Sequence, residues 1–110
     1  MPLYMFQASY TPASIKSMIG NPQDRSAAAS AMAESVGAKM LDIYFCMGSD
    51  DIVAIVEAPD DISVAAMSMA IGSSGAFSSG RTTKLISMSD GMQAMQKAGT
   101  AAANYSPPGS

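Results

Sequence analysis

The sequence contains no histidine, and this absence excludes a large group of functional sites. Without an imidazole there is no histidine-bound metal, no haem on a proximal histidine, and no Ser-His or Cys-His catalytic pair. The single cysteine, Cys46, has no second thiol for an internal disulfide bond and no basic neighbour, so we expect a buried, unreactive thiol. We therefore predict a protein of the reducing cytoplasm, with neither a metal nor a cofactor.

Charge is also scarce, because only 14% of the residues are Asp, Glu, Lys or Arg. The net charge is -3 and the six basic residues are dispersed, so we expect no surface for nucleic acid or for an anionic membrane. No apolar run approaches the length of a transmembrane helix. Residues 1–6 lack the basic start and the long apolar run of a signal peptide.

Apolar and aromatic runs predict four strands, and amphipathic stretches predict helices between them. The predicted strands are 3–10, 39–47, 52–58 and 81–88. Right-handed crossovers would place the two main helical segments on one face of an antiparallel sheet. The predicted fold class is α+β, a ferredoxin-like βαββαβ sandwich with a four-stranded antiparallel sheet and a C-terminal helix. We expect the domain at 1–98 and a flexible C-terminal tail at 99–110.

Capping residues predict where the helices begin and end. Thr11 and Asn21, each followed by proline, are typical of a helix start, and Asp60 is typical of an N-cap. Gly37 is typical of the residue that follows a helix. The protein is rich in methionine, and we expect its thioethers to fill gaps in the core rather than to bind copper(I). The methionines predicted to lie on core-facing stripes are Met18, Met32, Met69, Met92 and Met95.

The third predicted strand is apolar on both sides. One side carries Ile52, Ala54 and Val56, and the other carries Val53 and Ile55. The second strand is expected to place Leu41, Ile43 and Phe45 on one side and Met40, Tyr44 and Cys46 on the other. A sheet covered on one face should alternate apolar and polar residues. We therefore expect a homodimer or a higher oligomer, in which two copies pack sheet to sheet.

Short motifs distributed over almost the whole chain resemble those of a known family. They include Tyr10-Thr11-Pro12, Gly37-Ala38-Lys39, Val53-Ala54-Ile55-Val56-Glu57 and Thr82-Thr83. In these motifs the chain resembles the GYD-domain family, small bacterial proteins with the dimeric α/β-barrel form of the ferredoxin-like fold. The resemblance implies that fold and an oligomer, but no established biochemical role. The chain departs from the family's Gly-Tyr-Asp motif, because Asp50 stands in the tyrosine position while Asp51 keeps the aspartate.

Glu57 is the first candidate for a functional residue. Turn and cap chemistry explain the other acidic residues nearby, but neither requires a carboxylate at the end of an apolar strand. A glutamate there needs a hydrogen-bond partner or access to water. Two interpretations stay open. In the first, Glu57 anchors a ligand or transfers a proton in a cavity between two sheets. In the second, it occupies an edge position or forms an interface pair with Arg81 or Lys84.

The same cavity is predicted to be lined by further residues. With Glu57, the predicted ligand-binding set is Gln7, Tyr44, Asp51 and Arg81. Tyr4 and Tyr10 are also candidates, although packing is the favoured role of strand aromatics. The first hypothesis is a small cytoplasmic oligomeric module that binds a small molecule or serves assembly. The alternative is a cofactor-independent enzyme of monooxygenase or isomerase type, which rests on analogy with other dimeric α/β barrels.

Overall fold

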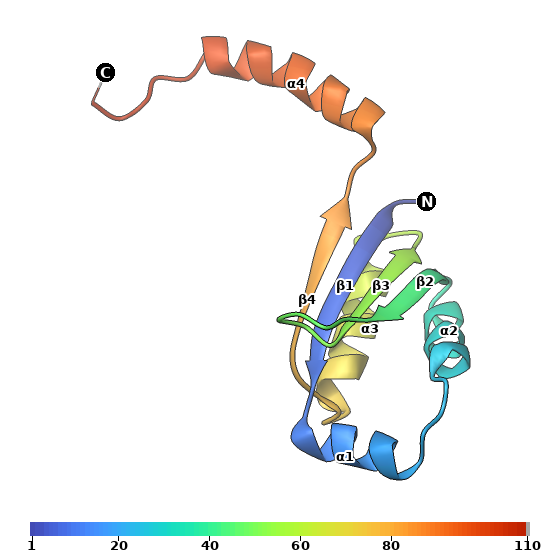
Figure 1. Ribbon diagram of the computed structural model, residues 1–110. Coiled ribbons are helices and arrows are strands. Elements are labelled where there is room, and N and C mark those ends of the chain that lie inside the picture. Colours follow the sequence, from blue (N-terminus) through green and yellow to red (C-terminus); the bar gives the residue numbers. More distant parts are fainter. Residues whose placement is uncertain (110) are drawn as a thin grey trace.

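Four antiparallel strands form one sheet, and helices cover one of its faces (Figure 1). The computed structural model describes residues 1–109. The elements are β1 (Leu3–Tyr10), α1 (Pro12–Gly20), α2 (Ser26–Ser35), β2 (Lys39–Phe45), β3 (Ile52–Glu57), α3 (Asp61–Ser73), β4 (Phe77–Leu85) and α4 (Met88–Ala103). The strand order is β2-β3-β1-β4, with every neighbouring pair antiparallel. The predicted ferredoxin-like α+β fold is therefore confirmed.

Side-chain caps fix the starts of three helices. Thr11 accepts a hydrogen bond from the Ser14 backbone N–H at 3.2 Å, and Asp60 accepts one from the Ser63 N–H at 2.8 Å, as the sequence predicts. Ser87 caps α4 in the same way. The predicted second helix start at Asn21 is wrong, because α2 begins at Ser26.

Strand β4 begins and ends earlier than the predicted range 81–88, and pairing with β1 determines where it begins. The small residues before Arg81 read as a loop in the sequence, but Ser79 pairs with Ser9, and the strand begins at Phe77 opposite Tyr10. The strand ends at Leu85, earlier than predicted, because Ser87 already caps α4. Contacts across a sheet thus determine strand ends that local composition does not reveal.

Two further expectations need correction. The C-terminal helix continues to Ala103, past the predicted boundary at residue 98, because the alanines after Gly99 favour helix. The second strand has a register shift between Met40 and Asp42. Met40 and Ile43 both line the cavity beneath the helices, so they share one face instead of opposing each other. A bulge of this kind inserts one residue and breaks strict alternation.

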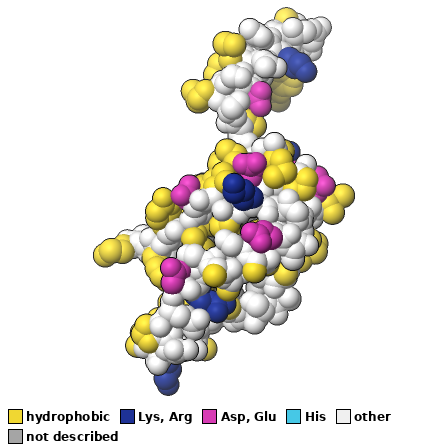
Figure 2. Space-filling view, turned by 90° about the vertical axis from the view of Figure 1, so that its right-hand side faces the viewer, with side chains coloured by type: hydrophobic (Ala, Val, Ile, Leu, Met, Phe, Trp, Pro, Cys, Tyr) yellow, Lys and Arg dark blue, Asp and Glu magenta, His cyan; other side chains and the backbone are white. Residues whose placement is uncertain are grey.

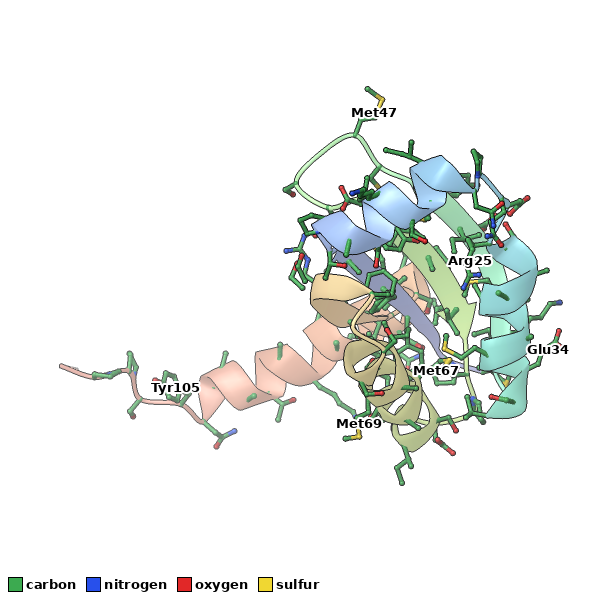
Figure 3. All side chains as sticks on the ribbon, turned by 90° about the horizontal axis from the view of Figure 1, so that it is seen from below. Arg25, Glu34, Met47, Met67, Met69 and Tyr105 are labelled. Atoms are coloured by element: carbon green, nitrogen blue, oxygen red, sulfur yellow. The ribbon has the colours of Figure 1, made fainter. Side chains whose placement is uncertain are left out.

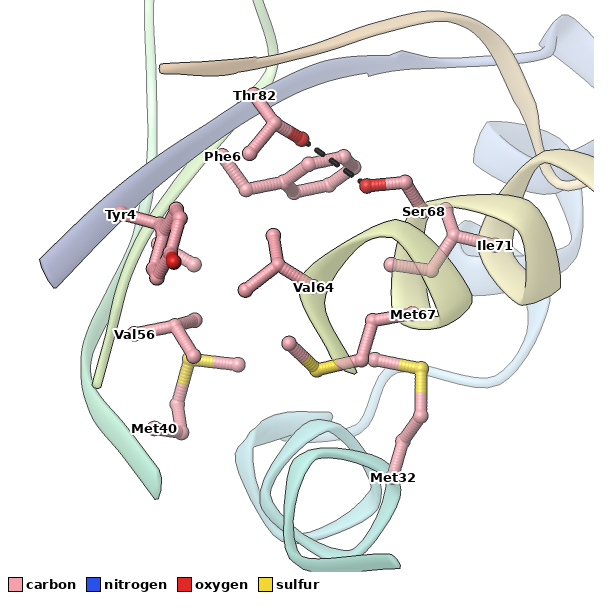
Figure 4. A pocket seen from close by; sticks show the side chains of 11 residues that line it. Tyr4, Phe6, Met32, Met40, Val56, Val64, Met67, Ser68, Ile71 and Thr82 are labelled. Carbon is pink, nitrogen blue, oxygen red and sulfur yellow. Dashed lines mark hydrogen bonds between the residues drawn. The ribbon is translucent and has the colours of Figure 1, made fainter. Parts of the chain in front are cut away.

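The buried core lies between the sheet and the helices α2 and α3. Its main members are Tyr4, Ala33, Val56, Val64 and Met67. A small cavity of about 30 Å³ remains there, and Figure 4 shows the thioethers of methionines from α2, β2 and α3 around it. The Ser68 and Thr82 hydroxyls, 3.1 Å apart, close one side of this cavity.

The core-facing side of α3 differs from the prediction. Val64 and Met67 pack on the sheet, whereas Met69, expected in the core, is 73% exposed. Figure 3 shows Met67 and Met69 on opposite sides of the helix. Because α3 is apolar around much of its circumference, its periodicity does not indicate which side is buried.

Gly37, in the turn between α2 and β2, has φ of +78°. We expect Gly37→Ala to lower the free energy of unfolding by about 1–2 kcal/mol, because a Cβ disfavours this left-handed conformation. The added methyl itself has room, with Pro59 Cγ at 3.9 Å. Urea denaturation measures the change, with Gly20→Ala as the control, since Gly20 lies at a helix end without positive φ. Equal stability of Gly37→Ala and wild type would contradict the prediction.

Helix α4 projects away from the sheet (Figures 1 and 2). The radius of gyration is 18.0 Å, against about 13 Å for a compact domain of this length. Its stripe of Met88, Met92 and Met95 is exposed, so the prediction that Met92 and Met95 face the core is wrong. Among residues 1–109, no helix has both the length and the apolar character needed to cross a membrane.

Candidate functional site

The sheet face opposite α2 and α3 is left uncovered by the helices. Buried and half-exposed residues alternate along β3, so Val53 and Ile55 lie on this open face while their neighbours lie beneath the helices. In β1, Met5 and Gln7 pair with Ile55 and Val53 and share that face. The expectation that β3 is apolar on both sides is confirmed.

Three rows of residues cross the open face, as the strand register defines them. The first row is Tyr44, Val53, Gln7 and Arg81. The second is Asp42, Ile55, Met5 and Thr83, and the third is Lys39, Glu57, Leu3 and Leu85. The centre of this face, on the two inner strands, is apolar (Met5, Val53 and Ile55), and Gln7 and Glu57 are the polar residues of these strands in the three rows. Three of the predicted site residues, Gln7, Tyr44 and Arg81, share the first row.

Arg81 is bound by groups of its own chain. Its guanidinium forms an ion pair with the Asp50 carboxylate, and its Nε donates a hydrogen bond to Gln7 Oε1 at 3.3 Å. The Asp50 side chain is only 13% exposed, whereas that of Arg81 is 60% exposed. The residue that replaces the tyrosine of the family motif therefore orients the one cation in the first row.

Asp51 has a structural role in joining the β2–β3 loop to β1. Its carboxylate accepts a hydrogen bond from the Tyr10 N–H at 2.9 Å, and its own N–H donates to Ala8 O at 2.9 Å. The Cys46 N–H donates to Asp51 O at 2.7 Å. Cys46 itself is half-exposed, not buried as predicted, because it lies at the start of this loop.

Glu57 lies at the other end of the open face. It is four residues along β3 from Val53, which corresponds to about 13 Å at the rise of a strand. The alternative of an edge position is wrong, because β3 lies between β2 and β1. Within the chain Arg81 and Lys84 bind Asp50 and Asp61, and a pair of Glu57 with either cation across an interface stays a prediction. Within residues 1–109 the Glu57 carboxylate makes neither a hydrogen bond nor an ion pair, although Lys39 faces it across the strand pair.

Tyr44 is 61% exposed, and its hydroxyl donates a hydrogen bond to Asp42 Oδ1 at 3.3 Å. Tyr4 and Tyr10, weighed as companions of Tyr44, lie on the helix-covered face. Hollows of the described chain on that side are lined by Tyr4 or Tyr10, and of the predicted set Glu57, Gln7, Tyr44, Asp51 and Arg81, Tyr44 alone contributes to their lining.

A cluster that sequence reasoning missed joins Tyr4, Asp61 and Lys84. The Tyr4 hydroxyl and Lys84 Nζ both donate to Asp61 Oδ1, the latter at 3.0 Å, and Nζ lies 5.7 Å from the centroid of the Tyr4 ring. The hydrogen bond from Tyr4, followed by that from Lys84, lowers the pKa of Asp61. The same bonds to Asp61 raise the pKa of Tyr4 and of Lys84. Only the register, which pairs Tyr4 with Lys84, reveals this cluster.

We expect Asp61→Asn to lower stability at neutral pH and to flatten its acid dependence. Because the folded state lowers the pKa of Asp61, its carboxylate stabilises the protein above the unfolded pKa, and this contribution is lost as pH falls through the folded pKa. Urea midpoints of variant and wild type should therefore converge at acid pH. Asp42→Asn, on the open face, is the control, and an equal effect of that change would assign the loss to net charge instead.

The fold and the open face define a class of protein, ferredoxin-like domains with a sheet covered on one side only. A profile of the GYD domain matches residues 4–100, so the chain belongs to the GYD domain family. Among solved structures, the crystal structure of MtbAldR is similar, with a TM-score of 0.53 and 19% identity over 78% of this chain. This chain spans about half of that one (52%), and the likeness concerns the fold alone. No curated protein sequence matches the chain.

Proposed function

We propose that the protein is a cytoplasmic homo-oligomeric binding and assembly module, in which the open sheet faces of two copies pack together. The observation that carries the proposal is the apolar centre of that face, formed by Met5, Val53 and Ile55. An uncovered apolar surface on the two central strands of a sheet marks an interaction site. A second copy supplies a surface of the same chemistry and of the same twist.

Helix α4 supports this assembly. It does not fold back over the sheet of its own chain (Figures 1 and 2). Its methionine stripe (Met88, Met92 and Met95) is exposed. Methionine adapts its shape to irregular partner surfaces. In the proposed assembly the stripe packs on the neighbouring copy.

A small molecule held between two such sheets would meet polar groups at both ends of the face. Tyr44, Gln7 and Arg81 lie at one end, and Glu57 lies at the other. Enzymatic chemistry at Glu57 stays a prediction. It requires a second polar group near that carboxylate, which a neighbouring copy would have to supply.

The mass of the native protein tests the proposal directly. Sedimentation velocity over a range of micromolar concentrations should give a dimer or a larger multiple of the 11.3 kDa chain. A stable monomer at every concentration would overturn the proposal, because the open face would then be in water.

A further inference from the structure

A half-open cavity lies on the opposite side of the sheet, where α1, α2 and α3 surround one end of the sheet (Figure 3). Its volume is about 490 Å³, within the usual range of roughly 300–1,000 Å³ for small-molecule sites. Most of the lining is apolar, including Phe6, Met18, Met32, Ile43, Ile71 and Phe77. Methionines in such a wall adapt to the shape of a ligand.

Among the residues that the structure describes, Arg25 is the only charged one that lines this cavity. Figure 3 shows its side chain between α1 and α2. Within residues 1–109 Arg25 forms no ion pair, and the cations of the two ion pairs are Arg81 and Lys84. The carboxylate of the adjacent Asp24 accepts a hydrogen bond from the Ser26 N–H at 2.8 Å. Ser14, Ser17 and Gln23 add hydrogen-bonding groups to the lining. The cavity therefore combines an apolar body with one positive charge, which is exposed to solvent and has no ion-pair partner in the described chain.

Tyr10 stands beside this charge. Its ring stacks on Phe77, with the centroids 4.6 Å apart. Burial raises the pKa of Tyr10, and the nearby charge of Arg25 opposes that increase, so at neutral pH the hydroxyl is protonated and can donate a hydrogen bond. A more open hollow of about 640 Å³ shares Tyr10, Gln23 and Arg25 and continues past Phe45. It provides an entrance at the polar end of the cavity.

We propose that this cavity binds a small amphipathic anion, an apolar body that carries a single carboxylate. The carboxylate pairs with the Arg25 guanidinium, which presents a planar fork of donors suited to two carboxylate oxygens. The apolar body lies against Met18, Met32 and Phe6. A neutral apolar molecule would leave the charge of Arg25 without a counterion, and a polyanion would bring more charge than one cation balances.

Decanoate is a probe of this chemistry, and decanamide is its uncharged counterpart. We expect the full-length protein to bind one decanoate per chain in isothermal titration calorimetry, and to bind decanamide less tightly. In Arg25→Gln the decanoate affinity should fall about tenfold or more, because a charge-assisted pair is lost, while decanamide binding should stay unchanged. The side chain of Arg25 makes no cap hydrogen bond to α2, so the variant keeps the structural contacts of its helix.

Lys16→Gln is the matched control, because it removes one positive charge from an exposed position of α1 outside the cavity lining. It should leave decanoate binding unchanged. Arg81→Gln tests the other location for a ligand, the open face of the sheet. Three results would overturn the proposal: no decanoate binding to the wild type, equal affinity in Arg25→Gln and wild type, or loss of binding in Arg81→Gln but not in Arg25→Gln. The last result would place the ligand between the sheets. The mass of each variant, measured in parallel, separates loss of this site from loss of assembly.

Discussion

Ile55→Asp is expected to convert the proposed assembly into folded monomers. Ile55 lies in the second row of the open face, between Asp42 and Met5, and is half-exposed in the isolated chain. A monomer therefore leaves the new carboxylate in contact with water. In a sheet-to-sheet dimer the same carboxylate is buried without a partner in both copies. The loss of hydration then costs several kcal/mol of association free energy for each buried ion. Association should weaken at least about a hundredfold, since each factor of ten corresponds to about 1.4 kcal/mol.

Sedimentation velocity measures this effect, and urea denaturation checks that the monomer is folded. Ile62→Asp is the matched control, because Ile62 lies on α3 and is already 81% exposed. We expect the control to keep the native mass. If Ile55→Asp also keeps it, the open face is not the contact between copies.

The parts of the fold that local chemistry determines were predictable. The caps at Thr11 and Asp60 and the turn at Gly37 each follow from the backbone needs of a few neighbouring residues. The two-sided apolar pattern of β3 indicated an uncovered face before any coordinate was known. Both kinds of signal are local, so tertiary contacts did not have to be inferred first.

The predictions that failed depend on contacts between distant segments. The burial of Val64 and Met67, in place of Met69, depends on how α3 sits against the sheet, and its nearly uniform apolar composition hides that choice. The start of β4 at Phe77 depends on pairing with β1. Neither contact can be inferred from the pattern of residues along the chain.

The candidate site was predicted in part. The register places Gln7, Tyr44 and Arg81 in one row, but it separates Glu57 from them. Arg25 was not predicted as a site residue, because a lone arginine before a run of alanines is typical of a solvent-exposed helix start, and its side chain is exposed in the structure. Its position at the end of an apolar cavity arises only when three helices meet over the sheet. Whether a charged side chain lies beside a cavity therefore depends on how the helices pack, and the spacing of residues along the sequence does not indicate it.

Met92→Asp is expected to weaken association as well, if α4 packs on a neighbouring copy. Met92 is 57% exposed and lies in the middle of the methionine stripe, one turn from Met88. Full burial of a methionine contributes about 1.5–3 kcal/mol, so its replacement by a charge should weaken association about ten- to a hundredfold.

The adjacent Gln93 provides the matched control for this variant, because it lies about 100° around the same helix from Met92. Gln93→Asp adds the same charge to the same turn and should leave the native mass unchanged. Sedimentation velocity distinguishes the two variants, and urea denaturation supplies the second measurement. If α4 instead covers its own sheet, Met92→Asp will lower the free energy of unfolding of the chain without changing its mass. Because α4 makes its apolar contacts with another copy in the proposed assembly, we expect the opposite result, a changed mass with the fold of the domain preserved.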